Sequence, residues 1–150
     1  MAKVQRFLGK EYLVSDYDLI QWDNKQPIAW AKIVMPLTAN DIDSIVCGAI
    51  EGGIGYWARI DRGKTNHWVE KPKNITASDW VTVLLLNGVP VWFHDCEDPE
   101  EKWELTLAKL QKGFELNYMH RPHDCDLDNA DASTYDCIIQ YALFGKLVYG

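Results

Sequence analysis

The chain has 150 residues, of which 47% are hydrophobic and 25% charged, and its formal net charge is −7. A chain of this size and composition can bury a core as one domain and is too apolar for a disordered protein. Basic and acidic residues balance in residues 1–80, whereas acidic residues predominate in 81–150. Because binding to a phosphate backbone needs clustered Lys and Arg, direct nucleic-acid binding is not expected.

The sequence also lacks signals for membrane insertion and export. No apolar run reaches the roughly 20 residues of a membrane span, and residues 1–10 lack the apolar stretch of a signal peptide. We therefore expect a cytoplasmic protein with no membrane partner. Its four cysteines, Cys47, Cys96, Cys125 and Cys137, are expected to be reduced thiols.

The first expected element is a β-hairpin near the N-terminus. The alternating segment Tyr17–Trp22 and the apolar, β-prone segment Ile28–Met35 flank a turn-rich stretch at residues 23–27. In such a hairpin, Trp22 and Trp30 would be cross-strand neighbours.

A helix over about residues 39–51 is expected next. Thr38 and Asp41 have the spacing of a helix cap followed by an acid, and Gly52-Gly53 marks the end of the helix. The apolar positions between them share one helical face: Ile42, Ile45, Val46, Ala49 and Ile50. A strand at Ile54–Ile60 and a polar surface loop at Asp61–Lys73 should follow.

The sequence predicts a second hairpin in the middle of the chain. Two apolar runs, Trp80–Leu86 and Val89–His94, are joined by Asn87-Gly88, which suits the positive φ angles of a two-residue hairpin turn. Because both runs are almost continuously apolar, we expect strands that are covered on both faces.

Two further helices are expected in the last third of the chain. Asp98-Pro99-Glu100-Glu101 resembles a capped helix start, and a stripe formed by Trp103, Leu107, Leu110 and Phe114 predicts a helix over about residues 99–115. A loop at Tyr118–Ala130 should lead to a third helix that is capped by Asp131 or Ser133 and closed by Gly145. Its inner face would carry Tyr135, Ile138, Tyr141 and Ala142, and Lys146–Tyr149 would add a short strand.

Together these elements predict an α+β fold. We expect a mostly antiparallel sheet of about five strands with three helices packed mainly on one face, forming a single domain over residues 1–150.

Potential metal ligands occur in two His-Asp-Cys triplets and one acidic run. His94-Asp95-Cys96 and His123-Asp124-Cys125, the latter with His120 nearby, offer zinc ligands but lack paired Cys-x-x-Cys spacing. Asp124, Asp126 and Asp128 have the spacing of a calcium loop, but Asn129 and Tyr135 replace its required Gly and Glu. We therefore expect no metal and no cofactor, with His94, His120, His123 and Cys125 as the weak candidates.

The segment around Gly52–Trp57 is the predicted binding region for a ligand or partner. Three glycines and two large aromatic residues meet there directly after a helix, so the backbone could approach a ligand closely beside the rings. The alternative is that the glycines end the helix and the aromatic residues belong to a strand. The candidate binding residues are Glu51, Gly52, Gly53, Tyr56, Trp57, Arg59 and Trp68, of which Trp68 would be an exposed anchor in the polar loop.

Two stretches of the chain resemble a family of small phage and prophage proteins. They are Ala49–Trp57 (AIEGGIGYW) and Asp136–Gly150 (DCIIQYALFGKLVYG), which are similar to the family's ALEGGxxYW-like segment and DCIIQYALFG-like final helix. The segment Lys102–Phe114 fits the same pattern, whereas Ile50 and Gly55 depart from it. The resemblance implies a viral origin, and compact phage proteins without a catalytic signature more often bind a host protein than catalyse a reaction.

The leading functional hypothesis is a non-catalytic phage or prophage accessory protein that binds a host factor, such as a component of anti-phage defence. The acidic second half could occupy a basic surface on that partner, and homo-oligomers are compatible with this function. One alternative is a sponge that sequesters a nucleotide-like immune signal, with the base stacked on Tyr56 or Trp57 and the phosphates bound by Arg59, Arg62 and Lys64. Another is a metal-dependent hydrolase built on His94, His120 and His123. No Gly-x-Ser-x-Gly motif or other nucleophile pair supports an assignment of catalytic residues.

Overall fold

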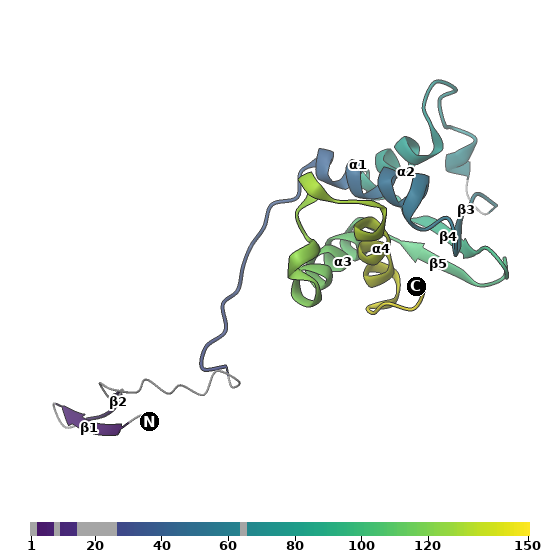
Figure 1. The fold of residues 1–150 in the computed structure, drawn as a ribbon. Helices are drawn as coiled ribbons and strands as arrows, with labels where there is room; N and C mark the ends of the chain where they lie inside the picture. Colours follow the sequence, from purple (N-terminus) through teal and green to yellow (C-terminus); the bar gives the residue numbers. More distant parts are fainter. Residues whose placement is uncertain (1–2, 8–9, 15–26, 64–65) are drawn as a thin grey trace. The chain divides into compact units, whose positions relative to one another are not determined.

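The computed structural model describes residues 3–7, 10–14, 27–63 and 66–150, with the first two ranges described by their backbone alone (Figure 1). The chain divides into an N-terminal unit, Met1–Met35, and a body, Pro36–Gly150. No described helix is both long and apolar enough to cross a membrane.

The described residues of the N-terminal unit form one hairpin and one irregular segment. Strands β1 (Lys3–Phe7) and β2 (Lys10–Val14) pair antiparallel, with Lys3 opposite Val14, and form a two-stranded sheet. The predicted strand at Tyr17–Trp22, including Trp22, lies outside the described residues. The prediction of a strand at Ile28–Met35 is wrong, because this segment has no regular structure and forms no backbone hydrogen bond with another described residue.

The first helix of the body confirms the prediction for residues 39–51. Helix α1 (Ala39–Gly48) starts at a complete capping box, in which Thr38 Oγ1 accepts from the N–H of Asp41 and Asp41 accepts from the N–H of Thr38. It continues into one wider π-helical turn, η1 (Ala49–Gly53). The predicted strand at Ile54–Ile60 is shorter than expected, since residues 54–57 form a turn before β3 (Ala58–Asp61).

A three-stranded antiparallel sheet lies in the body. Its order is β3, β4 (Val91–Asp95) and β5 (Lys102–Leu105), with Ala58 opposite Asp95 and Val91 opposite Leu105. The predicted α+β class is confirmed. The five-stranded sheet and the three helices are not, because the described strands form two separate sheets and four α-helices are present.

The predicted hairpin around Asn87-Gly88 is wrong in its first strand. Residues 77–86 form helix α2 (Ala77–Leu86), which starts where Thr76 Oγ1 accepts from the N–H of Asp79. Asn87-Gly88 ends this helix: Gly88 has φ +77°, its N–H donates to Leu85, and the N–H of Val89 donates to Leu84. This is a Schellman C-terminal cap, which requires the same positive φ as the hairpin turn.

The helix predicted at residues 99–115 starts later than expected. Residues 102–105 form β5, and helix α3 (Leu107–His120) begins at Thr106, whose Oγ1 accepts from the N–H of Lys109. Asp98-Pro99 therefore belongs to a β4–β5 connection and caps no α-helix. The predicted loop Tyr118–Ala130 is also shorter, since α3 runs to His120 and two 3₁₀ turns, Pro122–Asp124 and Leu127–Asn129, follow.

The final helix, α4 (Ala132–Phe144), agrees with the prediction at both ends. Asp131 caps its first turn by accepting from the N–H of Thr134, and Gly145 closes it with φ +71°. The predicted strand at Lys146–Tyr149 is absent, because these residues lie along the body without strand pairing.

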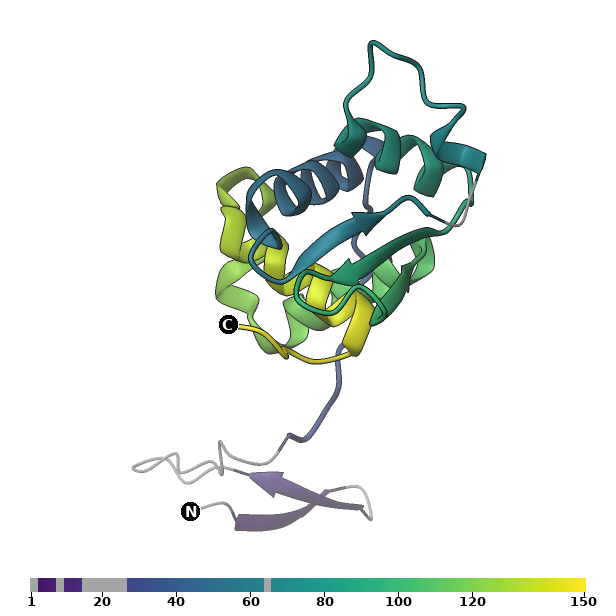
Figure 2. The ribbon, with the colours of Figure 1, turned by 90° about the vertical axis from the view of Figure 1, so that its right-hand side faces the viewer.

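The helices of the body pack in two pairs, α1 with α2 and α3 with α4. In the view of Figure 2, α1 and α2 lie above the three strands and α4 lies below them. The fully buried side chains come from all of these elements and form one core: they include Ile45, Trp57, Leu85, Phe93, Leu105, Leu110, Ile138 and Ile139.

Candidate functional site

Trp57, the centre of the predicted binding region, is part of the core. Its side chain is 2% exposed, and its Nε1–H donates to Asp136 Oδ1 over 2.9 Å. The ring of Tyr149 stacks on it with centroids 4.6 Å apart, and Trp103 and Phe144 pack at tilted angles. A ligand base could stack on this face of Trp57 only by displacing Tyr149.

Tyr56 is exposed, but its hydroxyl belongs to the same buried polar network. It donates to Asp136 Oδ2 over 2.7 Å, while Gln140 donates to Asp136 Oδ1 over 2.8 Å. Burial of the hydroxyl and the carboxylate of Asp136 raise the pKa of Tyr56 to about 12. The carboxylate thus joins the turn after η1 to α4, and the hydroxyl stays protonated at neutral pH.

The glycines of the predicted binding region serve close packing of backbone segments. A Cβ atom at Gly53 would lie 2.7 Å from the carbonyl oxygen of Ala132 and 3.2 Å from the amide nitrogen of Asp136. The space beside Gly53 is therefore filled by the start of α4. At Gly53 the alternative interpretation therefore applies: the glycine has a structural role and does not leave space for a ligand.

The remaining residues of the predicted binding region do not converge on one site. The Arg59 guanidinium donates to the carbonyl groups of Gly55 and Ala58. Trp68 is half-buried and packs against the core, with the Arg62 guanidinium 4.7 Å from its ring centroid, so it is not the predicted exposed anchor. Lys64, the third predicted phosphate ligand, lies outside the described residues.

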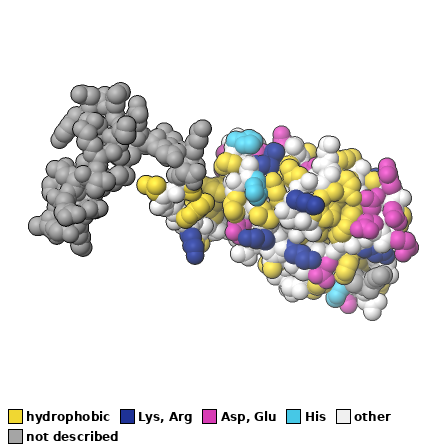
Figure 3. All heavy atoms as spheres, turned by 90° about the horizontal axis from the view of Figure 1, so that it is seen from below, with side chains coloured by type: hydrophobic (Ala, Val, Ile, Leu, Met, Phe, Trp, Pro, Cys, Tyr) yellow, Lys and Arg dark blue, Asp and Glu magenta, His cyan; other side chains and the backbone are white. Residues whose placement is uncertain are grey.

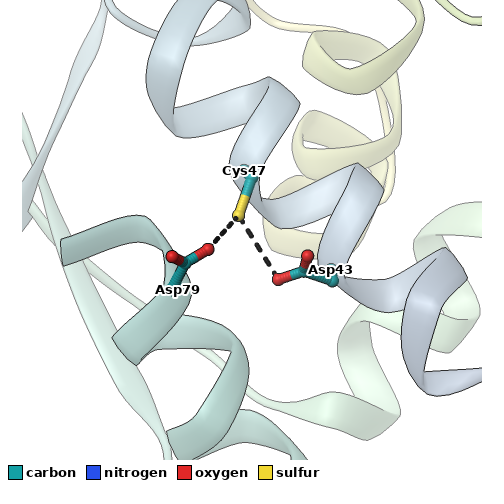
Figure 4. A group of neighbouring side chains, drawn as sticks. All are labelled: Asp43, Cys47 and Asp79. Carbon is teal, nitrogen blue, oxygen red and sulfur yellow. Dashed lines mark hydrogen bonds between the residues drawn. The ribbon is translucent and has the colours of Figure 1, made fainter. Parts of the chain in front are cut away.

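Glu51 faces a cluster of ionisable groups between α1 and α2. Its carboxylate accepts from Ser78 Oγ over 2.7 Å. Beside it, Cys47 Sγ lies 3.4 Å from an oxygen of Asp43 and 3.4 Å from an oxygen of Asp79, as Figure 4 shows. The ligand atoms of these three residues all lie within 4.8 Å of one another.

The chemistry of this cluster at neutral pH is that of a hydrogen-bonded thiol. Burial, followed by the flanking carboxylates, raises the pKa of Cys47 to about 12. A protonated thiol is a poor nucleophile and a poor metal ligand, since both roles need the thiolate. In this cluster the protonated Cys47 thiol is a hydrogen-bond donor to the carboxylates of Asp43 and Asp79. This cluster could not be predicted from residue spacing, because Cys47 and Asp79 are 32 positions apart.

The weak metal candidates are not brought together. Among the described residues, the only group of three His, Cys, Asp or Glu side chains with ligand geometry is the Cys47 cluster. His94 Nδ1 lies 2.8 Å from the Asp95 carbonyl oxygen, and His120 stacks on Tyr141. The Cys125 thiol donates a hydrogen bond to the carbonyl oxygen of Pro122.

Two acids of the predicted calcium run, Asp124 and Asp126, make local contacts within the chain. Asp126 accepts from the N–H of Asp128, and Asp124 pairs with Arg121 at 2.6 Å and accepts from the hydroxyl of Thr134. These bonds tie the loop to the start of α4.

An acidic tip, defined as residues Glu97–Glu101, connects β4 to β5. All five residues are exposed, and Glu97, Asp98, Glu100 and Glu101 are acids. None of them pairs with a basic group among the described residues. In Figure 3 acidic side chains gather on the side of the body where Figure 1 places this connection.

Hydrogen bonds to Asp95 link the start of the acidic tip to β4 and to Tyr149. Asp95 Oδ1 accepts from the N–H groups of Glu97 and Asp98 at 2.7 and 3.1 Å, and Tyr149 donates to its Oδ2 over 2.8 Å. The Glu97 N–H and the Tyr149 hydroxyl lower the pKa of Asp95. The sequence interpretation missed this feature because it assigned the same acids to the start of a helix, whereas residues 102–105 form a strand.

Comparison of the chain with protein-family models, curated proteins and solved structures finds no match. The resemblance to phage and prophage proteins therefore stays a prediction, and the function has to be inferred from the geometry of the chain itself.

Proposed function

We propose that this chain is a non-catalytic accessory protein of a phage or prophage that acts by binding a basic surface of a host protein, with a component of anti-phage defence as the expected target. The observation that carries the proposal is the acidic tip. It presents four exposed carboxylates within five residues on a turn whose backbone is fixed by Asp95.

Backbone hydrogen bonds to Asp95 separate this feature from an acidic loop without internal bonds. Fixing the backbone before binding reduces the entropy that must be lost in a complex. Closely spaced carboxylates on a fixed turn attract a partner's Lys and Arg side chains, speed the encounter and select against acidic partners. A host protein with a nucleic-acid-binding surface has the required charge.

The packing of the other predicted site residues also supports a binding protein over a small-molecule sponge. Trp57 and Gly53 are occupied by contacts with Tyr149 and the start of α4. Arg59 is bonded to backbone carbonyl groups of its own turn. The acidic tip, in contrast, has exposed carboxylates that pair with no basic group among the described residues.

The test is capture of host proteins on the immobilised full chain, with charge reversal at the acidic tip. The variant Glu97→Lys/Glu100→Lys is compared with Glu70→Lys/Glu115→Lys, which makes the same change in net charge at exposed positions elsewhere. We expect the tip variant to lose captured protein by about tenfold or more and the control to retain it. Raised ionic strength and added double-stranded DNA should release the partner from the wild type.

Equal loss in both variants would show a general effect of net charge and would contradict a role for the acidic tip. Turnover of a substrate by the purified chain would contradict a non-catalytic function.

A further inference from the structure

The segment Lys146–Gly150 lies against the body as a bound peptide would. Its residues 147–150 are all described and form neither a helix nor a strand. Leu147 and Val148 are 41% and 51% exposed, whereas the ring of Tyr149 packs against the core. The segment therefore has one apolar anchor, its tyrosine ring.

Three aromatic rings and one carboxylate surround the anchor. Tyr149 stacks on Trp57 with centroids 4.6 Å apart and an angle of 9° between the planes. Its centroid lies 6.3 Å from that of Trp103 and 6.0 Å from that of Phe144, and its hydroxyl donates to Asp95 Oδ2 over 2.8 Å. These contacts select a six-membered aromatic ring with a hydrogen-bond donor at its far end, which is the shape of tyrosine.

The side chain of Gln140 binds the backbone of the same segment. It is 1% exposed, and its Oε1 accepts from the N–H groups of Val148 and Tyr149 at 2.7 and 2.8 Å. Its Nε2 donates to the carbonyl oxygen of Tyr149 over 3.1 Å and to Asp136 Oδ1 over 2.8 Å. Backbone hydrogen bonds beside a pocket for one side chain are the usual means of binding a peptide. We call these surroundings the tyrosine box, which consists of Trp57, Asp95, Trp103, Gln140 and Phe144.

The polar groups of the tyrosine box define what can occupy it. Without an occupant, Gln140 Oε1 would lose both N–H donors and Asp95 Oδ2 would lose the Tyr149 hydroxyl, and unpaired buried polar groups are costly. The box therefore favours an occupant with two adjacent backbone N–H groups and a phenolic hydroxyl. The charge of a phosphotyrosine would face the Asp95 carboxylate, so the matching ligand is a peptide with an unmodified tyrosine.

We propose that the tyrosine box is a binding site for a peptide segment of a partner protein that carries an unphosphorylated tyrosine, and that Val148-Tyr149 occupies this site in the free chain. The partner binds by displacing the chain's own segment. That segment competes at an effective concentration in the millimolar range, as expected for a short tether, so binding is gated. The inference is independent of the proposed function, because the tyrosine box contains no residue of the acidic tip.

Calorimetric titration of the full-length variant Tyr149→Ala with the peptide acetyl-Lys-Leu-Val-Tyr-Gly-amide tests the site. We expect the variant to bind at least about tenfold more tightly than the wild type, in which the box is filled. Tyr56→Ala is the control, because it also removes a hydroxyl bonded to a carboxylate but leaves the box filled, and it should match the wild type. Peptides with Phe or phosphotyrosine in place of Tyr should bind Tyr149→Ala at least about tenfold more weakly, since neither can donate to Asp95.

Hydrogen exchange of the wild type tests displacement without a substitution and decides alone if Tyr149→Ala does not fold. The N–H groups of Val148 and Tyr149 should exchange by local opening at least about tenfold faster than those of Ile138 and Ile139 in α4. Millimolar peptide should speed their exchange further, because it binds the open state. The inference would be overturned if folded Tyr149→Ala did not bind the peptide, if the Tyr and Phe peptides bound equally, or if the peptide left exchange at residues 148 and 149 unchanged.

Discussion

Trp30 and Trp57 show how differently the two units of this chain treat the same side chain. Trp30, in the N-terminal unit, is 86% exposed on a segment without regular structure. Trp57, in the body, is 2% exposed, surrounded by three aromatic rings and hydrogen-bonded to Asp136. Apolar content alone therefore does not distinguish a core residue from one that is available to a partner.

The difference lies in what the neighbouring sequence can build. The body has four α-helices, three of them started by Thr caps and the fourth by Asp131, and they pack in pairs beside a three-stranded sheet. The N-terminal unit has two paired strands and an unpaired apolar segment among its described residues. The body buries a core of apolar side chains, whereas Ile28, Trp30 and Val34, among the described residues of the N-terminal unit, are exposed.

The largest expected effect comes from making one substitution in both units. Trp57→Ala should lower the free energy of unfolding of the body by about 3–5 kcal/mol, because it leaves a cavity among Trp103, Phe144 and Tyr149 and orphans an acceptor on Asp136. Trp30→Ala should change it by less than about 0.5 kcal/mol when both are measured by chemical denaturation at concentrations where the chain is monomeric. Similar losses in the two variants would refute the contrast between the units.

A second pair of variants separates close packing from open space within the predicted binding region. Gly53→Ala should destabilise the body by about 1–3 kcal/mol, because the new Cβ would meet the Ala132 carbonyl oxygen at 2.7 Å. Gly55→Ala should be neutral or stabilising by up to about 1 kcal/mol, since nothing lies within 4 Å of its Cβ position and its φ is not positive. Thermal unfolding of both variants measures this, and a harmless Gly53→Ala would restore the idea of space for a ligand.

Local signals predicted the ends of two of the four described α-helices, α1 and α4. Thr38, Asp131 and Gly145 act where the sequence placed them, because a cap depends on the backbone within a few residues. Asn87-Gly88 was wrongly predicted as a hairpin turn because its local backbone signal also fits the end of a helix. A positive φ suits both a hairpin turn and a helix C-terminus, and the distinction came from the Thr76 cap and from the helical spacing of the buried Val81, Leu84 and Leu85.

The polar networks of the body could not be predicted from spacing. Trp57 donates a hydrogen bond to Asp136, which is 79 positions away in the sequence. Cys47 lies within hydrogen-bond distance of Asp79, which is 32 positions away. No periodicity in one segment encodes such pairs, because the fold alone brings them together. The sequence of Gly52–Trp57 resembled a ligand site because glycines beside aromatic rings occur in such sites. The same residue types also allow a turn to pack closely against a helix, which is their role at Gly53.

The smallest expected effect is a loss of stability of the body at alkaline pH. Burial and hydrogen bonds to Asp136 and Asp95 raise the pKa values of Tyr56 and Tyr149 from 10.0 to about 12. The folded body therefore keeps protons that the unfolded chain releases, so this contribution is complete below pH 10 and is lost as the pH rises towards 12. The melting temperature of the wild type should fall across that range more steeply than that of Tyr56→Phe/Tyr149→Phe, which starts lower at neutral pH because it lacks both hydrogen bonds. Parallel declines would show that these hydroxyls do not couple the acidic tip and the last residues of the chain to the stability of the core.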